Sequence, residues 1–591
     1  MTIIAAVARG HNGSTTLLKD GEIIFYLEEE RLSRHKYDGS PLLGLMKVFD
    51  YVDHIDHLVV CHTHRHGPQL DWTGEDMYSG FVRKLAKGKF EFRTHYIDNV
   101  HHQMHAACGF YNSGFKTAAC VIADGAGSFL KLPDIDDVVY EFETIFKVGY
   151  PTEFETVYKH VGTKQAIGLI EEDNNVFITE YPGHTKMYEA VTQYCGFPAI
   201  EAGKLMGLAP YGSKNDSLPP FFHGEWGNRD LIIPTYPNAA QINVGRFDVL
   251  KGDVMNHESG EYTQIQKDMA YAIQEATENR MIELIRKAHE LTGENNIVIC
   301  GGYGLNCVAN YKYWKEFPDL NIYCEPISHD GGTSIGGAKF IWHMSQTVDA
   351  ESEEAAELHL EKYPQKQESV YYGPKYNPET YEEFLSADDI QVSEVTYNDV
   401  AQLISEENIV TIYQGRSEGG PRALGNRSIL FDPRVKDGKD IVNRVKRREW
   451  FRPFACSILK ESAEEWFDLA GRDETPHMMY AVKCQDGVEE KIPSVIHVDG
   501  TCRIQTVTEE QNEHYYNLIS AFNDLTSTPI LFNTSFNLGG EPLVETLEDA
   551  IKTLRNSDIE YLYLPEIGKL IKVENLPQGY ELTENISSLD S

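Results

Sequence analysis

Two histidines four residues apart are the first residues whose types and spacing indicate chemistry. They are His101 and His105, in the segment His-His-Gln-Met-His-Ala-Ala. On a helix, this spacing places both imidazoles on one face, where they can hold one metal ion. An isolated pair of this kind is more typical of a partly exposed helix whose histidines make other hydrogen bonds, so the pair alone is moderate evidence.

Two aspartates at junctions between a predicted strand and a glycine-rich turn strengthen the prediction of a metal site. They are Asp124, in Ala-Asp-Gly-Ala-Gly, and Asp330, in His-Asp-Gly-Gly-Thr-Ser. Such turns let main-chain amides approach a phosphate group. Two neutral imidazoles and carboxylates suit ferrous iron, manganese or zinc, and they leave positions open for phosphate oxygens and water. The sequence therefore predicts an open, catalytic metal site.

A second group of candidate residues is rich in arginine and lies between residues 414 and 455. Glycine, proline and aromatic residues interrupt its charges, which include Arg416, Arg422, Arg427, Lys446 and Arg452. This pattern differs from a solvated helix face and indicates partial burial. Buried arginines need anions, because each charge-assisted hydrogen bond contributes about 1.5–3 kcal/mol. A small phosphorylated ligand is the expected partner, and a groove for single-stranded nucleic acid is the alternative.

Strand-like runs recur among the elements that must position these residues. Residues 3–8, 14–18 and 22–28 are expected to form an antiparallel meander, because turn residues separate them. A comparable pattern begins at residues 117–124 and continues with runs at 141–147 and 155–160. This duplication indicates two related lobes that close over a nucleotide. Apolar residues at helical spacing predict a long helix over 264–291, followed by a strand at 296–300.

Length and composition predict more than one domain. The chain has 591 residues, of which 41% are hydrophobic, whereas a single core stops growing near roughly 250–300 residues. A stretch rich in Glu, Gln and Lys near residues 347–369 predicts a boundary, with domains at 1–350 and 371–591 and a linker at 351–370. The net charge of -38 disfavours polyanionic partners unless a local basic surface overrides it, and it is mainly expected to keep a large chain soluble.

The remaining composition predicts a cytoplasmic protein. The ten cysteines form no CxxC pair, which argues against a disulfide framework and a zinc ribbon. The N-terminus does not resemble a cleavable signal, and no apolar run approaches the roughly 20 residues that span a bilayer. The three histidines at 62, 64 and 66 fit one face of an edge strand better than a metal site. The basic run at 83–93 is expected to be a solvated loop, or a contact for the backbone of a DNA acceptor.

Ordered motifs along nearly the whole chain carry a resemblance to a known family. They lie at residues 10–14, 28–36, 101–105, 202–212, 414–428, 443–455, 499–506 and 533–542. With these motifs the chain resembles the NodU/CmcH (TobZ-like) O-carbamoyltransferase family. The resemblance implies an α/β chain with two parts. The first is a duplicated N-terminal domain of the actin and sugar-kinase type, as in threonylcarbamoyl-transferases, and the second is a C-terminal YrdC-like α/β domain.

The resemblance also implies which residues bind ligands. The metal would be held by His101, His105, Asp124 and Asp330. The adenylate would contact residues of the glycine-rich segments, namely Gly125, Gly127, Gly301, Gly302, Asn306, Asn310 and Gly331. Carbamoyl phosphate and ATP would contact the C-terminal residues Arg416, Arg422, Arg427, Ser428, Lys446, Arg452, Arg503, Asn533 and Ser535. Within this last group, Arg416, Arg422 and Arg427 would serve the triphosphate or the domain interface.

Three further residues are implied to be catalytic. Lys36 and Lys204 would stabilise a phosphate group or the developing oxyanion electrostatically. His11 would do acid–base work on the acceptor side. The chain departs from the family at Asn12, where the family usually has aspartate. Because an amide cannot accept a proton as a carboxylate does, a general-base role at that position is not expected here.

The resemblance implies a reaction that uses ATP, with Mg²⁺, and carbamoyl phosphate to form a carbamoyl-adenylate. The carbamoyl group would then pass to an acceptor hydroxyl, on a sugar or natural product or on a hydroxymethylated pyrimidine nucleotide or DNA. Nucleic acid is thus expected only as an acceptor, no membrane partner is expected, and a homodimer is left open. The alternatives are an actin-fold kinase or ATPase, and a non-catalytic protein that binds nucleotide or nucleic acid.

Overall fold

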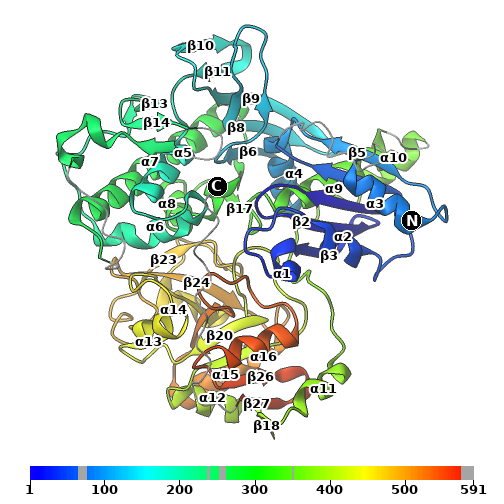
Figure 1. The fold of residues 1–591 in the computed structure, drawn as a ribbon, viewed down its shortest axis with the longest axis vertical. Helices are drawn as coiled ribbons and strands as arrows, with labels where there is room; N and C mark the ends of the chain where they lie inside the picture. The colour runs from blue at the N-terminus through cyan, green and yellow to red at the C-terminus, as the bar shows by residue number, and fades with distance from the viewer. Residues whose placement is uncertain (64–75, 236–239, 252–260, 349, 351, 574–591) are drawn as a thin grey trace, which may run out of the picture.

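The chain forms two stacked parts, of which the upper one in Figure 1 contains two large sheets and the lower one a third. This computed structural model describes residues 1–63, 76–235, 240–251, 261–348, 350 and 352–573. His64 and His66 of the predicted edge strand, and residue 351 of the predicted linker, lie outside the described residues.

The first sheet contains the predicted meander. Its strands, in the spatial order β3-β2-β1-β4-β5, are β1 (Ile3–Ala8), β2 (Ser14–Lys19), β3 (Glu22–Glu28), β4 (His57–Cys61) and β5 (Arg93–Ile97). β2 runs antiparallel to both β1 and β3, whereas β4 runs parallel to β1 and β5. Every residue of β1 is buried, which is expected of a central strand covered on both faces.

The second sheet repeats this arrangement. Its strands follow the order β10-β11-β9-β8-β6-β16-β17 and comprise β6 (Thr117–Ala123), β8 (Val139–Gly149), β9 (Glu153–Gly162), β10 (Leu169–Glu172), β11 (Val176–Thr179), β16 (Asn296–Cys300) and β17 (Asn321–Cys324). β8 is antiparallel to β6 and β9, and β16 is parallel to β6 and β17. The five strands β9-β8-β6-β16-β17 therefore match β3-β2-β1-β4-β5 in order and direction. This duplication confirms the predicted actin-like topology.

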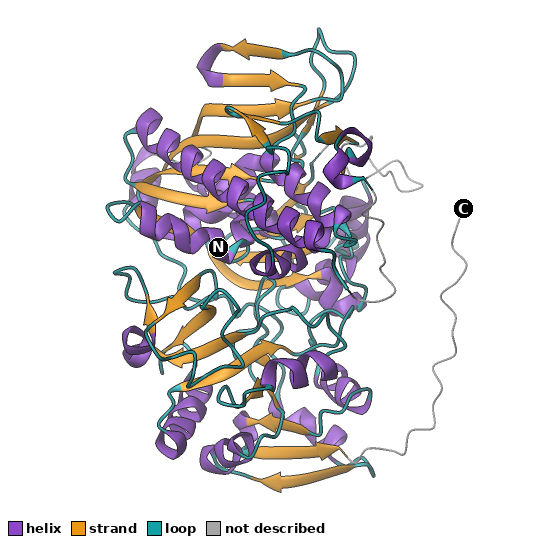
Figure 2. Cartoon of the chain, turned by 90° about the vertical axis from the view of Figure 1, so that its left-hand side faces the viewer, coloured by secondary structure: helices purple, strands orange, loops and turns teal. Residues whose placement is uncertain are grey.

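Two helices pack against each other, and each lies on one of these sheets. Figure 2 draws the helices of this part in purple beside the orange strands. α4 (His101–Ser113) lies on β6, β8 and β16, and α9 (Gly332–Thr347) lies on β1, β2 and β4. On the other face of the second sheet, α7 (Gln264–Thr292) packs with α5 (His184–Tyr194), which confirms the predicted long helix. A capping box at Thr263 and Gln266 begins α7, and Gly293 in the left-handed conformation ends it.

The C-terminal part is one mixed ten-stranded sheet covered by helices, so the predicted α/β class is confirmed. Its strand order is β18-β27-β26-β19-β20-β25-β21-β24-β23-β22. These strands are β18 (Ile390–Glu394), β19 (Val410–Tyr413), β20 (Arg427–Phe431), β21 (Ala455–Leu459), β22 (Phe467–Asp468), β23 (Ala481–Cys484), β24 (Thr501–Val507), β25 (Ile530–Ser535), β26 (Tyr561–Leu564) and β27 (Lys569–Val573). The helices include α12 (Tyr397–Ser405), α13 (Gly438–Val445), α15 (Glu513–Thr526) and α16 (Leu547–Arg555). The domain limits proposed from composition remain a prediction.

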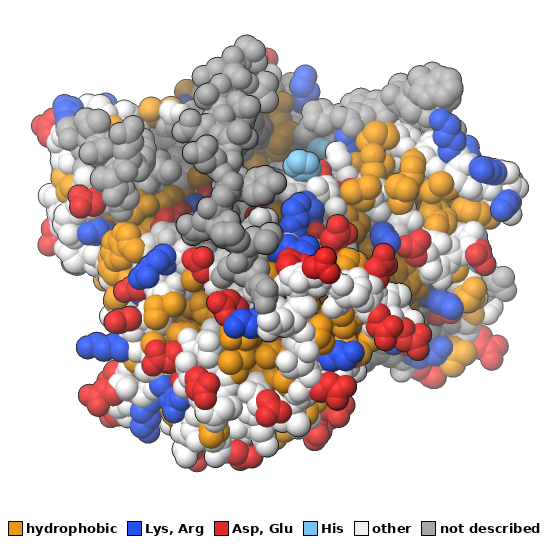
Figure 3. Space-filling model, turned by 60° about the horizontal axis from the view of Figure 1, so that its bottom comes forward, with side chains coloured by type: hydrophobic (Ala, Val, Ile, Leu, Met, Phe, Trp, Pro, Cys, Tyr) orange, Lys and Arg blue, Asp and Glu red, His pale blue; other side chains and the backbone are white. Residues whose placement is uncertain are grey.

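Two expectations concern the surface, namely a solvated loop at residues 83–93 and a local basic surface. The loop expected at 83–93 is wrong for residues 83–86, which end α3 (Met77–Ala86), a helix whose first turn is capped by Asp76. On the face drawn in Figure 3, basic and acidic side chains are interspersed and form no continuous basic stripe among the described residues. In the described part of the chain, no helix combines the length and the apolar character needed to cross a membrane.

Candidate active site

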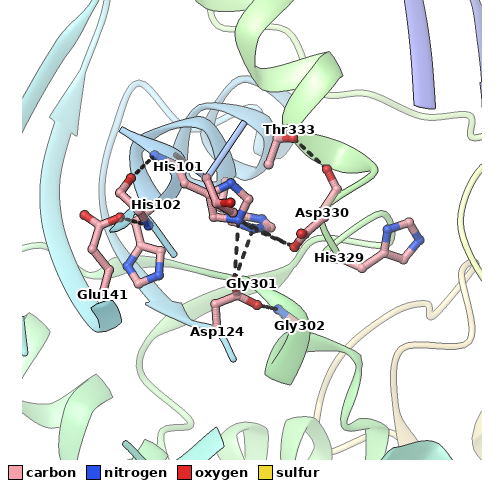
Figure 4. Close-up of polar contacts among 12 residues, drawn as sticks. His101, His102, Asp124, Glu141, Gly301, Gly302, His329, Asp330 and Thr333 are labelled. Atoms are coloured by element: carbon pink, nitrogen blue, oxygen red, sulfur yellow. Dashed lines mark hydrogen bonds and ion pairs between the residues drawn. The ribbon is translucent and has the colours of Figure 1, made fainter. Parts of the chain in front are cut away.

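The four predicted metal ligands converge at the N-terminus of α4. One ligand atom from each of His101, His105, Asp124 and Asp330 lies within 4.8 Å of the others, and all four residues are buried. The two histidine Nε2 atoms are 3.0 Å apart, and His101 Nε2 lies 3.5 Å from a carboxylate oxygen of both Asp124 and Asp330. Figure 4 shows His101, Asp124 and Asp330 pointing toward one another, whereas His102 points away beside Glu141.

The four ligands come from three positions in the duplicated fold. α4 supplies both histidines, Asp124 follows β6, and Asp330 precedes α9. Burial disfavours a charged His101, but Asp330 and Asp124 outweigh burial and raise the pKa of His101 to about 10. Two imidazole nitrogens and two carboxylates packed this closely fit a divalent metal ion such as iron, manganese or zinc.

Neighbouring groups orient the ligands. Cys300 Sγ lies 3.8 Å from His105 Nδ1, and Ser128 Oγ accepts a hydrogen bond from the main-chain N–H of His101 at 3.0 Å. His329 precedes Asp330, and its Nε2 lies 2.7 Å from Glu28 Oε1. Because a metal ligand must be held in one orientation, these outer contacts support the geometry of the cluster.

The glycine-rich turns pack closely around the same centre. Gly301 has φ +89°, and a Cβ there would meet the carbonyl oxygen of Ala123 at 2.4 Å, so only glycine fits. Gly302 donates its N–H to Asp124 Oδ1 at 3.1 Å. Of the residues predicted to contact adenylate, those that line the cavity described next are Gly125, Gly302 and Asn306. Those that do not line it are Gly127, Gly301, Asn310 and Gly331.

A cavity of about 1060 Å³ joins the two chemistry-bearing regions predicted from sequence. Asp124, Asp330 and His11 line one side of it, and Arg422, Lys446 and other basic residues of the C-terminal part line another. Its volume is enough for a nucleotide and a small second ligand, since pockets for drug-sized molecules measure about 300–1,000 Å³. The tertiary structure therefore unites the predicted metal site and the arginine-rich region.

Four cations crowd the C-terminal side of this cavity, and we call them the cationic pocket: Arg422, Lys446, Arg448 and Arg452. Burial lowers the pKa of all four below its usual range, and repulsion from neighbouring arginines lowers it further. For Arg452, the carboxylates of Glu449 and Glu201 oppose this lowering. The pKa of Arg422 falls to about 9. Such a group is electrostatically unfavourable by itself, so it favours a ligand with several negative charges.

Lys446 is hydrogen-bonded to residues at the end of β25. Lys446 Nζ donates to the carbonyl oxygen of Ser535, and it lies 3.3 Å from Ser535 Oγ and 3.2 Å from Asn537 Oδ1. Ser535 Oγ in turn donates to Asn537 Oδ1 at 2.6 Å. Lys446, Ser535 and Asn537 all line the cavity. The predicted pair Lys446 and Ser535 is therefore brought together.

Five predicted C-terminal residues do not line the cavity: Arg416, Arg427, Ser428, Arg503 and Asn533. Arg416 donates to the carbonyl oxygens of Gly373, Tyr372 and Ile24, each at 2.6 Å. Since Ile24 belongs to β3, these bonds favour the interface role over the triphosphate role. The pKa of Arg422 is lowered partly by the charge of Arg503, which therefore lies close to the cationic pocket.

The other three residues of this group are held inside the C-terminal sheet. Arg427 is fully buried, donates to the carbonyl oxygens of Gln414, Gly415, Asn426 and Glu545, and lies over the ring of Tyr413. Ser428 Oγ accepts the N–H of Gly425 at 3.0 Å, and Asn533 Nδ2 donates to Ser457 Oγ at 2.9 Å. Binding roles for these side chains remain predictions.

The three residues predicted to be catalytic all line the cavity. His11 is 57% exposed, and its Nε2 lies 3.6 Å from Asp330 Oδ2. Lys36 and Lys204 both pair with Glu201, at 3.3 and 2.7 Å. Asn12, which replaces the family aspartate, has φ +60°, a left-handed conformation that asparagine and aspartate tolerate better than most residues.

Several cavity residues were not predicted as site residues. Arg448 lies in the arginine-rich run itself, and Asn537 and Glu449 lie in the quoted motifs. Lys186, which pairs with Glu189 at 2.7 Å, comes from α5 and had no sequence signal. The density of cations around Lys446 could have predicted Arg448 as a site residue. Lys186 could not be predicted in this way, because only the tertiary fold brings α5 to the cavity.

Comparison with known proteins agrees with this geometry. The profile described as "Carbamoyltransferase N-terminus" matches residues 69–339, and "Carbamoyltransferase C-terminus" matches residues 401–569. Nodulation protein NolNO of Sinorhizobium fredii is 30% identical, with 93% of this chain and 78% of the relative covered. The chain belongs to the carbamoyltransferase family. The resemblance stated from motifs is thereby confirmed, and the protein is an enzyme of carbamoyl transfer.

Two further similarities concern this carbamoyltransferase. The 3'-hydroxymethylcephem-O-carbamoyltransferase of Streptomyces clavuligerus is 28% identical, with 60% of this chain and 61% of that protein covered. Among solved structures, full-length HypF in the phosphate- and nucleotide-bound form is similar with a TM-score of 0.36 at 12% identity. That alignment covers 59% of this chain and 56% of HypF.

Proposed function

We propose that this carbamoyltransferase uses ATP and carbamoyl phosphate to make a carbamoyl-adenylate and transfers the carbamoyl group to an acceptor hydroxyl. The observation that carries the proposal is the cavity that joins the cationic pocket to the His and Asp cluster. Carbamoyl phosphate is hydrolysed to carbamate and phosphate. Carbamate then attacks the α-phosphate of ATP, and pyrophosphate leaves. The acceptor oxygen finally attacks the carbamoyl carbon, the bond to the adenylate oxygen breaks, and AMP is released.

The cationic pocket is the proposed donor site. Its guanidinium and ammonium groups neutralise the phosphates of carbamoyl phosphate and of ATP with Mg²⁺, so that two anions can approach each other. Arg452 and Lys446 line this side, and Ser535 Oγ can donate to a phosphate oxygen once a ligand displaces Asn537. Release of pyrophosphate leaves a carbamoyl-adenylate that water destroys, and transfer within the same cavity limits its exposure to bulk water.

The His and Asp cluster is the proposed transfer site. A divalent metal held by His101, His105, Asp124 and Asp330 would act as a Lewis acid toward the adenylate phosphate. His11, exposed to the cavity, takes the proton from the acceptor hydroxyl. Lys36 supplies positive charge for the leaving AMP phosphate. Three points remain predictions: the identity of the metal as ferrous iron, manganese or zinc, the nature of the acceptor, and the cytoplasmic location.

The test combines the purified protein with MgATP, carbamoyl phosphate and a panel of hydroxylated acceptors that includes sugars and hydroxymethylated pyrimidines. We expect pyrophosphate release that needs both donor substrates, and a mass gain of one carbamoyl group on one acceptor. Phosphate release from ATP without carbamoyl phosphate, with no pyrophosphate, would instead support an actin-fold kinase or ATPase. Binding of ATP with no turnover for any acceptor would support a nucleotide-binding protein.

A further inference from the structure

One wall of the cavity carries side chains of alternating charge. Arg452 pairs with Glu449 at 3.4 Å, and Glu449 pairs with Lys204 at 2.6 Å. Lys204 also pairs with Glu201 at 2.7 Å, and Glu201 pairs with Lys36 at 3.3 Å. All five side chains line the cavity. The series therefore runs from the cationic pocket to residues of the N-terminal part.

Glu449 is the member of this series that crosses between the two parts. It lies in the loop after α13, whereas Lys204 lies on α6 (Ala202–Leu208). The aromatic rings of Trp450 and Tyr211 are 4.9 Å apart at the same junction and hold this loop near α6. The ion pair between Glu449 and Lys204 is therefore built into a packed interface rather than formed by two free surface side chains.

Glu449 also lies where a negatively charged ligand would balance the charge of the cationic pocket. Among the described residues, Glu449 is the carboxylate that forms an ion pair with a member of the cationic pocket. Its side chain is 26% exposed, and those of Lys204 and Arg452 are 20% and 22% exposed. These side chains are shielded enough for strong pairing and open enough for a phosphate to reach the same cations.

We propose that Glu449 is a competitor carboxylate: it pairs with Arg452 and Lys204 in the ligand-free enzyme and gives both cations up to a polyanionic phosphate ligand. This role rests on the proposed donor site. A ligand that binds the Arg452 nitrogen now facing Glu449 displaces that carboxylate, so part of its binding free energy is used for the exchange. Once displaced, Glu449 no longer ties Lys204 to the C-terminal part, and Lys204 becomes available to a phosphate leaving the donor site.

The test is the affinity for inorganic pyrophosphate, measured by calorimetry on the full-length enzyme. Glu449→Gln keeps the shape of the side chain and removes its charge. We expect this variant to bind pyrophosphate about fivefold more tightly than the wild type, because the competing charge is lost. In an Arg452→Ala background, Glu449→Gln should give a clearly smaller gain in pyrophosphate affinity, because Arg452, one of the two cations that pair with Glu449, is absent.

The matched control is Glu541→Gln. Glu541 lines the same cavity and forms no ion pair with the cationic pocket among the described residues; its carboxylate accepts the N–H of Leu538. A change below about twofold is expected for this control, because Glu541 acts on Lys446 through its charge without forming an ion pair with it. Equal gains in both variants, or unchanged or weaker binding by Glu449→Gln with a normal melting temperature, would overturn the inference. If the wild type fails to bind pyrophosphate, the proposed donor site is wrong, and this role fails with it.

Discussion

At the scale of single residues, the metal cluster shows why side-chain direction matters more than residue type. His101, His102 and His105 all lie on α4, yet only the first and last reach the cluster. His102 Nδ1 bonds instead to Thr144 Oγ1 at 2.8 Å, and burial lowers the pKa of His102 to about 4. The spacing of four residues selects one helix face, and His102 lies on another.

His105→Ala is expected to lower the metal affinity by more than about tenfold, because outer contacts alone are worth about tenfold to hundredfold. Carbamoyl transfer should be lost, whereas pyrophosphate release from ATP and carbamoyl phosphate should persist, since the cationic pocket is untouched. Metal analysis and a pyrophosphate assay measure the two effects. His102→Gln is the matched control on the same helix. Equal metal loss in both variants would contradict the assignment.

The cationic pocket predicts a dependence on pH. Burial, and then Arg448 and Arg452, lower the pKa of Lys446 well below its usual value. A bound polyanion favours the charged form and raises that pKa, so ligand binding should take up a proton at a pH between the two values. Affinity for pyrophosphate should accordingly fall as pH rises through this window.

Calorimetry in buffers of different ionisation enthalpy measures this proton uptake. Lys446→Met should reduce the uptake, and the comparison between variant and wild type removes the titration of pyrophosphate itself. A wild-type enzyme and a Lys446→Met enzyme with identical proton uptake would show that Lys446 does not titrate with the ligand.

At the scale of elements, a buried carboxylate ties the second sheet to the helix that borders the cavity. Glu143 on β8 lies 2.6 Å from His160 Nδ1 on β9 and 2.8 Å from His184 Nδ1, the first residue of α5. Glu143 also accepts the main-chain N–H of His184 at 3.1 Å. These contacts place the start of α5, and so Lys186 and Glu189, beside the turn that follows Asp124.

Glu143→Gln should destabilise the protein by about 3 kcal/mol, because it removes one partner from a buried charged group. Despite burial, His160 and His184 hold the pKa of Glu143 well below its usual value. The stabilisation is therefore present above about pH 4.5 and is lost as pH falls toward the lowered pKa. Thermal unfolding should show a midpoint lower by about 5 °C or more. Glu155→Gln, on the exposed face of β9, should leave the midpoint unchanged.

At the scale of the whole molecule, main-chain carbonyls of each part accept donors from the other. Arg34 donates to the carbonyl oxygens of Leu543 and Pro542 at 2.6 and 3.0 Å, and Asn310 Nδ2 donates to that of Met479 at 3.0 Å. Arg416 donates to Ile24 in the same way. These bonds hold together the two parts whose residues line one cavity, so the two chemistries share one space.

Arg416→Ala separates the two roles that sequence left open for this residue. If Arg416 holds the interface, ATP affinity should stay within about twofold, while unfolding followed by calorimetry should lose cooperativity between the two parts. Calorimetric titration with MgATP supplies the first measurement. A large loss of ATP affinity with unchanged unfolding would instead support a role for Arg416 in binding the triphosphate.

Sequence alone determined the family, the metal ligands as candidates, the duplicated strand pattern and the long helix over 264–291, because motifs and periodicity are local properties of the chain. The tertiary structure decided which cations face the cavity. Arg416 and Arg427 stand in the same motif as Arg422, but only long-range packing shows that main-chain carbonyls take their donors. The tertiary structure also brought Glu449 to Lys204. Their contact depends on how the two parts pack together, and the sequence around each residue does not indicate it.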